Sequence, residues 1–177
     1  PATSAAGDDL VQYGYAVRLP AGWAHTGGLP ERRRSLLTPV LAPDGADLVS
    51  VERTPLGYDA DAEPRRARVE LRAEFDRAVR AGAALSGFDD DARVAGRRVV
   101  TYRETIGGDG GAGAAAGDGT SGAAHGDGRG ADAAEVDWYV VLDGDAQLSV
   151  GCRHTASGAA AVATACATVV GSVRRTT

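Results

Sequence analysis

Alternating apolar and polar positions predict six β-strands along this chain. The first runs from Tyr13 to Leu19, where every second residue is a large apolar one, as in a strand with one buried face. Turn signals separate two pairs of consecutive predicted strands, Pro43-Asp44-Gly45 in one pair and Asp143-Gly144 in the other, and we expect both pairs to form hairpins. The six predicted strands cover residues 13–19, 34–41, 48–53, 98–106, 135–142 and 146–154.

Two helices are predicted by apolar residues that recur every three or four positions. Residues 64–81 place Leu71 and Phe75 on one stripe, and residues 159–173 place Cys166 on a second stripe of the same kind. Each helix must bury its single stripe against a sheet. We therefore predict an α+β fold, a mainly antiparallel β-sheet of about six strands with two main helices. It forms an α/β/α sandwich if the helices cover opposite faces, and two layers if they share one.

The same pattern divides the chain into one domain and its flanking segments. Residues 13–173 carry the predicted elements, residues 1–12 are predicted to be a linker or disordered terminus, and residues 174–177 a tail. Inside the domain, residues 87–91 are predicted to be a polar loop. Residues 107–133 hold 19 Gly or Ala among 27 residues and no large apolar residue. We predict a disordered insert there, because such a segment cannot bury enough surface to offset its ordering entropy.

A repeat within this insert suggests a second interpretation. Gly-Asp-Gly recurs every nine residues, at 108–110, 117–119 and 126–128, and calcium-binding β-rolls have a nonapeptide period of similar composition. Such rolls also need a large aliphatic residue in each repeat, and none occurs here. We therefore predict an expanded loop, with no metal ion or other cofactor.

Composition and charge narrow the classes of function. The formal net charge is −5 and all 19 basic residues are arginines interspersed with acids, so the chain lacks the basic excess of a nucleic-acid-binding protein. No apolar run approaches the roughly 18 residues that suggest a membrane span. The chain begins at Pro1 and contains no Met, which suggests a fragment or processed form. We expect membrane contact only through an upstream segment that this chain does not contain.

The two cysteines are the first candidates for chemistry. Cys152 lies on the apolar face of a predicted strand, and Cys166 lies on the apolar stripe of the helix that follows. A disulfide between them would close a loop of about 15 residues and stabilise the fold by about 3 kcal/mol in the chain-entropy model. The alternative is two thiols that pack in the core. Neither cysteine has the setting of a nucleophile and no histidine pair has metal-ligand spacing, so we predict no catalytic or metal site.

Other candidate contacts are an arginine cluster and the two tryptophans. Arg32, Arg33 and Arg34 form the densest basic cluster, which could contact lipid headgroups or an acidic partner. A solvated turn that leads into a strand is the commoner role of such a cluster. Trp23 and Trp138 are expected to pack between sheet and helix, with a role as interface anchors as the alternative.

Several short segments, taken in order, resemble a known family. They are Gly14–Trp23, Gly96–Glu104, Val136–Gly144 and Gln147–Cys152, followed by Cys166 in the last helix. Together they are similar to the C-terminal domain of type VII secretion-associated proteins of actinobacteria. The resemblance implies a PsbP-like fold, an extracytoplasmic place in the cell envelope beyond a membrane-spanning segment, and protein components of a secretion system as partners. It supplies no catalytic residues, and the Gly-rich insert departs from the family pattern.

Three classes of function follow. We predict a non-enzymatic binding or scaffold domain associated with a type VII protein secretion system. The alternative is a small-ligand or lipid-binding carrier of the cell envelope, which would need an apolar cavity on the order of several hundred cubic ångströms. An enzyme would need a cleft with paired titratable groups of perturbed pKa, and the sequence reveals no such pair.

Overall fold

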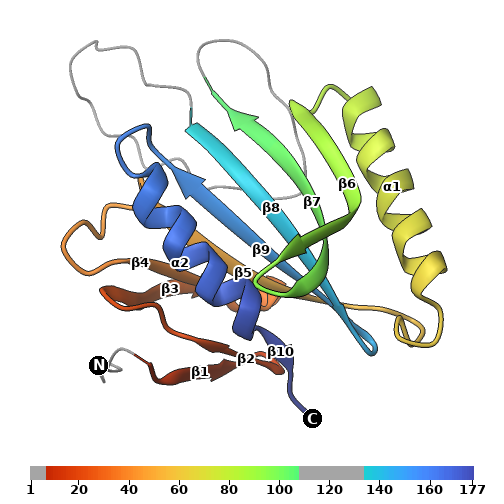
Figure 1. Ribbon diagram of the computed structural model, residues 1–177, viewed down its shortest axis with the longest axis horizontal. Coiled ribbons are helices and arrows are strands. Elements are labelled where there is room, and N and C mark those ends of the chain that lie inside the picture. The colour runs from red at the N-terminus through yellow and green to blue at the C-terminus, as the bar shows by residue number, and fades with distance from the viewer. Residues whose placement is uncertain (1–6, 108–133) are drawn as a thin grey trace.

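The computed structural model describes residues 7–107 and 134–177, which form two α-helices and two β-sheets (Figure 1). The helices are α1, Pro64–Arg80, and α2, Ala159–Ser172, and a short 3-10 helix, η1, spans Pro30–Arg32. The strands are β1 Asp9–Gln12, β2 Tyr15–Arg18, β3 Trp23–Leu29, β4 Arg34–Pro39, β5 Leu48–Pro55, β6 Leu85–Val94, β7 Arg97–Ile106, β8 Ala134–Asp143, β9 Ala146–His154 and β10 Arg174–Arg175. The predicted insert, 107–133, lies outside the described residues except for Gly107.

Seven strands form the large sheet in the order β3-β4-β5-β9-β8-β7-β6, and every neighbouring pair is antiparallel. Both predicted hairpins are present. β4 pairs with β5, and β8 pairs with β9 around Gly144, whose φ of 56° is the positive value that a tight hairpin turn requires. β1, β2 and β10 form a small second sheet beside α2 (Figure 1). The fold is therefore α+β with mainly antiparallel sheets, as predicted.

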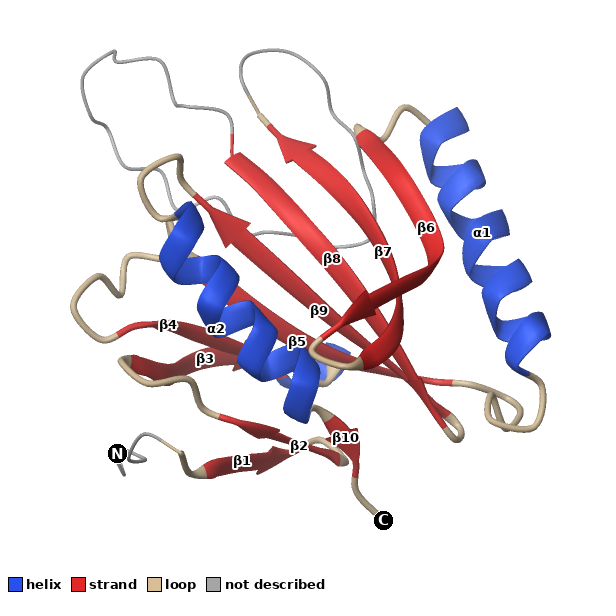
Figure 2. Cartoon of the chain, in the orientation of Figure 1, coloured by secondary structure: helices blue, strands red, loops and turns tan. Residues whose placement is uncertain are grey.

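One face of the large sheet is closed by α2 together with the small sheet. α2 lies over this face alongside β9 (Figure 2), and its Val162 and Val169 are 1 % and 0 % exposed. Leu148 and Val150 of β9 are fully buried against them, and Val17 of β2 belongs to the same cluster. Two sheets and a helix thus share one continuous core, which we call the α2 core.

The opposite face carries a smaller core beneath α1, which we call the α1 core. Successive residues of one strand divide between the two: Val141 of β8 packs in the α2 core and Val140 in the α1 core. Leu71 of α1 and Val100 of β7 are the other buried members. The helices therefore cover opposite faces, which is the α/β/α alternative. α1 lies at the β6 edge of the sheet (Figure 1), so it covers only part of its face.

The predicted disulfide is present. It joins Cys152 of β9 to Cys166 of α2, whose Cα atoms lie 6.1 Å apart, and so fastens the last helix to the middle of the large sheet. Both cysteines are buried, at 2 % and 3 % exposure. Among the described residues, no helix has the length and apolar character that crossing a bilayer demands.

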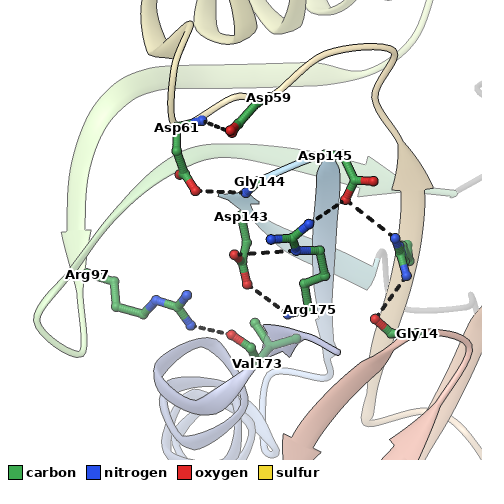
Figure 3. A network of polar contacts seen from close by, with 10 residues as sticks. Gly14, Asp59, Asp61, Arg97, Asp143, Gly144, Asp145, Val173 and Arg175 are labelled. Carbon is green, nitrogen blue, oxygen red and sulfur yellow. Dashed lines mark hydrogen bonds and ion pairs between the residues drawn. The ribbon is translucent and has the colours of Figure 1, made fainter. Parts of the chain in front are cut away.

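A polar network fastens the small sheet to the β8–β9 turn (Figure 3). The Arg175 amide donates to Asp143 Oδ2 at 2.7 Å, and the Arg175 guanidinium donates to Asp145 Oδ1 at 3.0 Å. Arg53 of β5 lies 3.6 Å from Asp145 and donates to the Gly14 carbonyl at 3.0 Å. The network therefore joins both sheets and holds the β8–β9 turn in place.

The two segments predicted to flank the domain both contain strands. β1 lies within residues 1–12, which we expected to be a linker, and β10 lies within the expected tail, 174–177. Each is ordered by pairing with β2. Tyr13 and Gly14 form the turn between β1 and β2, with φ of 51° and 82°, so the first predicted strand begins at Tyr15 instead. These strands are too short to produce a legible period-two pattern.

The prediction of a polar loop at 87–91 was wrong, because these residues belong to β6. The pairing of β6 with β7 shifts register twice, between Ser86 and Asp89 and again before Ala92. β6 is also an edge strand, and the side chains of Asp89, Asp90 and Asp91 are exposed. Bulges and exposed charges are common on edge strands, and both remove the alternation by which a strand is predicted. β3 was missed for a similar reason, since it has a bulge and two glycines.

Candidate ligand-binding cleft

A cleft of about 410 Å³ lies between α1 and the part of the large sheet that α1 leaves uncovered. This volume falls within the roughly 300 to 1,000 Å³ that is usual for small-ligand sites. Its floor comes from β5, β9, β8 and β7, one wall comes from α1 and β6, and the opposite end comes from η1 and β4. The cleft is therefore a consequence of where α1 sits, since a helix nearer the middle of the sheet would fill it.

Strand register places an aromatic pair on the floor. Tyr102 of β7 lies opposite Trp138 of β8, and Trp138 lies opposite Gly151 of β9. The rings of Tyr102 and Trp138 stack, with centroids 6.2 Å apart and planes 19° from parallel. A Cβ atom on Gly151 would lie 2.8 Å from two carbons of the indole. Gly151 therefore allows the indole to lie close against the sheet.

One stripe of α1 forms the wall of the cleft. Its members, spaced as one face of a helix requires, are Leu71, Glu74, Phe75 and Ala78. The Phe75 ring contacts Phe88 of β6 with centroids 5.1 Å apart, and meets Tyr102 edge-on at 5.7 Å. Phe75, Phe88, Tyr102 and Trp138 thus form one continuous aromatic surface, which we call the aromatic wall.

A compact ion-pair group forms the other end of the cleft. Glu52 of β5 accepts from Arg34 of β4, which lies directly opposite in the sheet, with the closest oxygen and nitrogen 2.6 Å apart. Arg32 of η1 reaches the other Glu52 oxygen at 3.4 Å. All three side chains are mostly buried, so both arginines are committed to this carboxylate.

The carboxylates on the aromatic side have no such cationic partners. The Trp138 indole N–H donates to Glu104 Oε2 at 2.8 Å, and within the described part of the chain neither Glu104 nor Glu74 forms an ion pair. Burial, and then the carboxylates of Glu104, Glu74 and Glu52, raise the pKa of Tyr102 to about 12. The Tyr102 hydroxyl is therefore protonated at neutral pH and lies in a negative field.

The Tyr102 hydroxyl is the cleft's protonated group without an internal partner among the described residues. The Tyr102 hydroxyl forms no hydrogen bond with the described residues, so it can donate one to a ligand. A general base would need a pKa near neutrality, whereas the shift at Tyr102 is in the opposite direction. In residues 7–107 and 134–177, no three histidine, cysteine or acidic side chains come together as metal ligands.

The residues singled out from the sequence lie in three different places. Arg32 and Arg34 line the cleft beside Glu52, whereas Arg33, with φ of 51°, is exposed between them, so the three do not form a single patch. Trp23 is 8 % exposed in the α2 core, as expected. Trp138 is only half-buried and lines the cleft, contrary to the expectation of a core position. The contact role of the arginine cluster stays a prediction.

Some of the residues that line the cleft could be predicted from the sequence to share one face of the sheet. Tyr102 and Glu104 alternate on one face of a predicted strand, and a large aromatic residue at Trp138 faces the same way on the next strand. Their register across a gap of more than 25 residues could not be predicted. The position of α1 at the sheet edge, which turns these residues into a cleft, could not be predicted either.

Comparison with known proteins shows a fold and no function. No protein-family model matches the chain, and no curated protein matches it. Among solved structures, the chain is similar to a protein of Bacteroides thetaiotaomicron VPI-5482, with a TM-score of 0.55 and 11 % sequence identity. The similarity covers 97 % of this chain and 49 % of that one, so this chain spans about half the length of that protein. At this identity, the likeness concerns the fold alone.

Proposed function

We propose that this chain is a non-enzymatic, extracytoplasmic binding domain that takes its ligand into the cleft between α1 and the large sheet. The observation that carries the proposal is the aromatic wall, four rings in contact that border a cleft of about 410 Å³. Binding sites are typically lined by aromatic and other apolar side chains, with a small number of polar groups among them.

Polar groups with unused capacity in the same cleft support a binding role. The Tyr102 hydroxyl and the Glu74 carboxylate have no hydrogen-bond partner among the described residues. Gln147 donates only at 3.4 Å, to Ser149, so its amide is poorly satisfied. Glu74 is exposed to solvent, whereas Tyr102 and Gln147 are partly buried. Buried polar groups are normally satisfied within a protein, so the Tyr102 hydroxyl and the Gln147 amide are available to a ligand.

The place of this domain in the cell is part of the proposal. Disulfides persist in oxidising compartments, and the Cys152–Cys166 bridge is therefore consistent with a domain outside the cytoplasm. The association with a type VII secretion system, and the PsbP-like relationship, rest on the resemblance of short segments described above. On this basis we propose a protein component of the secretion system as the partner.

A carrier of small apolar molecules is the second candidate, and the volume of the cleft favours it. The charges disfavour it, because Arg32, Arg34, Glu52, Glu74 and Glu104 all border the cleft. A wholly apolar ligand would take water from these groups and leave Glu74 and Glu104 without a cationic partner, which is costly. Mass spectrometry of the protein under native conditions would reveal a co-purified lipid, and a stoichiometric one would favour the carrier over the binding domain.

Site-specific photocrosslinking in the native cell envelope tests the proposal. A photoreactive benzoylphenylalanine replaces Ala78, which lines the cleft, or Val11 of β1, which is 65 % exposed on the small sheet and serves as the matched control. We expect the Ala78 position to crosslink to a component of a type VII secretion system and the Val11 position to give no such product. Equal crosslinking at both positions, or capture only from Val11, would contradict the cleft as the binding site.

A further inference from the structure

We infer that the cleft binds a positively charged peptide segment, with an arginine or lysine side chain against the aromatic wall and close to Glu74 and Glu104. The inference rests on the proposed function, since it names the chemistry of the ligand for the same cleft. Three independent features carry it: the distribution of charge, the nature of the aromatic surface, and the extent of the floor.

The two ends of the cleft differ in the sign of their uncompensated charge. Arg32 and Arg34 share Glu52, so two positive charges face one negative charge and this end needs no further cation. On the aromatic side, Glu74 and Glu104 have no cationic partner among the described residues, and Glu104 accepts only the indole N–H of Trp138. A cationic group on the ligand would neutralise the side of the cleft where the negative charge is uncompensated.

The aromatic wall adds a second preference for a cation. The electron-rich faces of tryptophan, tyrosine and phenylalanine attract ammonium and guanidinium groups. This chain already uses the interaction at Phe88, where the Arg72 guanidinium carbon lies 5.0 Å from the ring centroid. Arg66 lies over Tyr58 in the same way, at 3.8 Å. In the cleft, Trp138 and Tyr102 border the same space as the Glu74 and Glu104 carboxylates, so one cation can reach both the rings and the carboxylates.

The extent and polarity of the floor favour a peptide over a small cation. Four interstrand steps separate β4 from β7, which corresponds to about 19 Å, or about six extended residues. Thr54, Gln147 and Ser149 lie along this path and offer hydroxyl and amide groups to a peptide backbone. The excess positive charge at the Arg34 end makes the cleft dipolar, so a segment with a single basic residue suits it better than a polybasic one.

Calorimetric titration with defined peptides tests the inference. The probes are capped heptapeptides of alanine and leucine that carry arginine, lysine, glutamine or glutamate at the centre. We expect the arginine and lysine peptides to bind about tenfold more tightly than the glutamine peptide, and the glutamate peptide to bind most weakly. The preference should shrink as salt is raised, because salt screens the attraction between partly exposed charges.

Two variants separate the role of charge from that of shape. The double substitution Glu74→Gln with Glu104→Gln removes both carboxylates, and the glutamine at 104 keeps an oxygen that can accept the Trp138 indole N–H. We expect it to weaken the arginine peptide about tenfold and to leave the glutamine peptide unchanged. Asp44→Asn is the matched control: it removes one charge in an exposed turn outside the cleft and keeps the acceptor for the Ala46 amide.

Three outcomes would overturn the inference. The first is equal affinity for the arginine and glutamine peptides, and the second is an arginine-peptide affinity that the double variant changes less than twofold. The third is binding of argininamide, the single amino-acid amide, as tightly as the arginine peptide. This result would make the ligand a small cation. If the glutamine peptide binds as tightly as the arginine peptide and Ala78 still crosslinks in the envelope, the inference fails while the proposed function stands.

Discussion

The two faces of the large sheet differ in how completely they are covered: one is closed, and the other is open beside α1. On the α2 face, a helix, a second sheet and a disulfide close over side chains such as Leu148 and Val150, which are fully buried. On the α1 face, the buried members of the described cluster are Leu71, Val100 and Val140, and other residues of this face border a cleft. A closed face can hold the fold, while an open one can hold a ligand.

Two tyrosines show the contrast at the scale of single side chains. Burial raises the pKa of both Tyr15 and Tyr102 to about 12. In the α2 core, the Tyr15 hydroxyl lies 2.6 Å from Ser35 Oγ and 3.0 Å from the Val51 carbonyl oxygen. In the cleft, the Tyr102 hydroxyl has no such partner among the described residues and is surrounded by carboxylates. One hydroxyl is bonded within the structure, and the other is available to the ligand that we propose.

The largest expected effect comes from truncating the same residue type in the two cores. Leu148→Ala in the α2 core should lower the free energy of unfolding by about 4 kcal/mol, because the closed surroundings cannot collapse onto the lost volume. Leu71→Ala in the α1 core should cost about 2 kcal/mol, because this side chain is 8 % exposed beside an open cleft. Urea denaturation followed by circular dichroism measures both, and equal losses would contradict the distinction between the faces.

Removing the disulfide should have the next largest effect. We expect Cys152→Ala combined with Cys166→Ala to lower the free energy of unfolding by about 3 kcal/mol, because the unfolded chain loses the constraint of a closed loop. Denaturation of the unmodified protein with and without a reductant is the control. The double variant should not respond to the reductant. A loss below about 1 kcal/mol would show that the α2 face is closed by packing alone.

The tyrosine pair gives the smallest and most diagnostic difference. Tyr15→Phe should cost about 1 to 2 kcal/mol, because it removes the buried hydrogen bonds of the Tyr15 hydroxyl with the Val51 carbonyl and Ser35 Oγ. Tyr102→Phe should change stability by less than about 0.5 kcal/mol, because no buried hydrogen bond is lost. It should still weaken peptide binding, and an unchanged affinity would remove the Tyr102 hydroxyl from the site.

The same pair predicts a dependence of stability on pH. Each tyrosine ionises at a higher pH in the folded protein than its ordinary value of 10.0, so the folded state holds the proton more tightly. The stability that results is present below about pH 10 and is lost as the pH rises towards about 12. Denaturation series across this range should fall less steeply for Tyr102→Phe than for the unmodified protein. An identical slope would contradict the raised pKa.

Regular elements were predictable from the sequence, and irregular ones were not. The stripe containing Leu71 and Phe75 predicts α1, and the apolar faces of Cys152 and Cys166 predict a pairing that the structure contains. β6 was not predicted, because its bulges and three exposed aspartates interrupt the alternation of apolar and polar residues. The cleft was not predicted either. Periodicity indicates on which face a residue lies, but it does not indicate how much of that face a helix covers. Only the placement of α1 makes Trp138 a cleft residue and not a core one.

The chain carries one tryptophan on each face, and together they allow the most direct test of this account. The two indole N–H signals in a nitrogen–proton correlation spectrum report Trp138 in the cleft and Trp23 in the α2 core, and Trp138→Phe assigns them. As the arginine-centred heptapeptide is added, the account predicts that the Trp138 signal shifts progressively and saturates while the Trp23 signal stays in place. A shift of Trp23 alone, or of neither signal at saturating peptide, would contradict it.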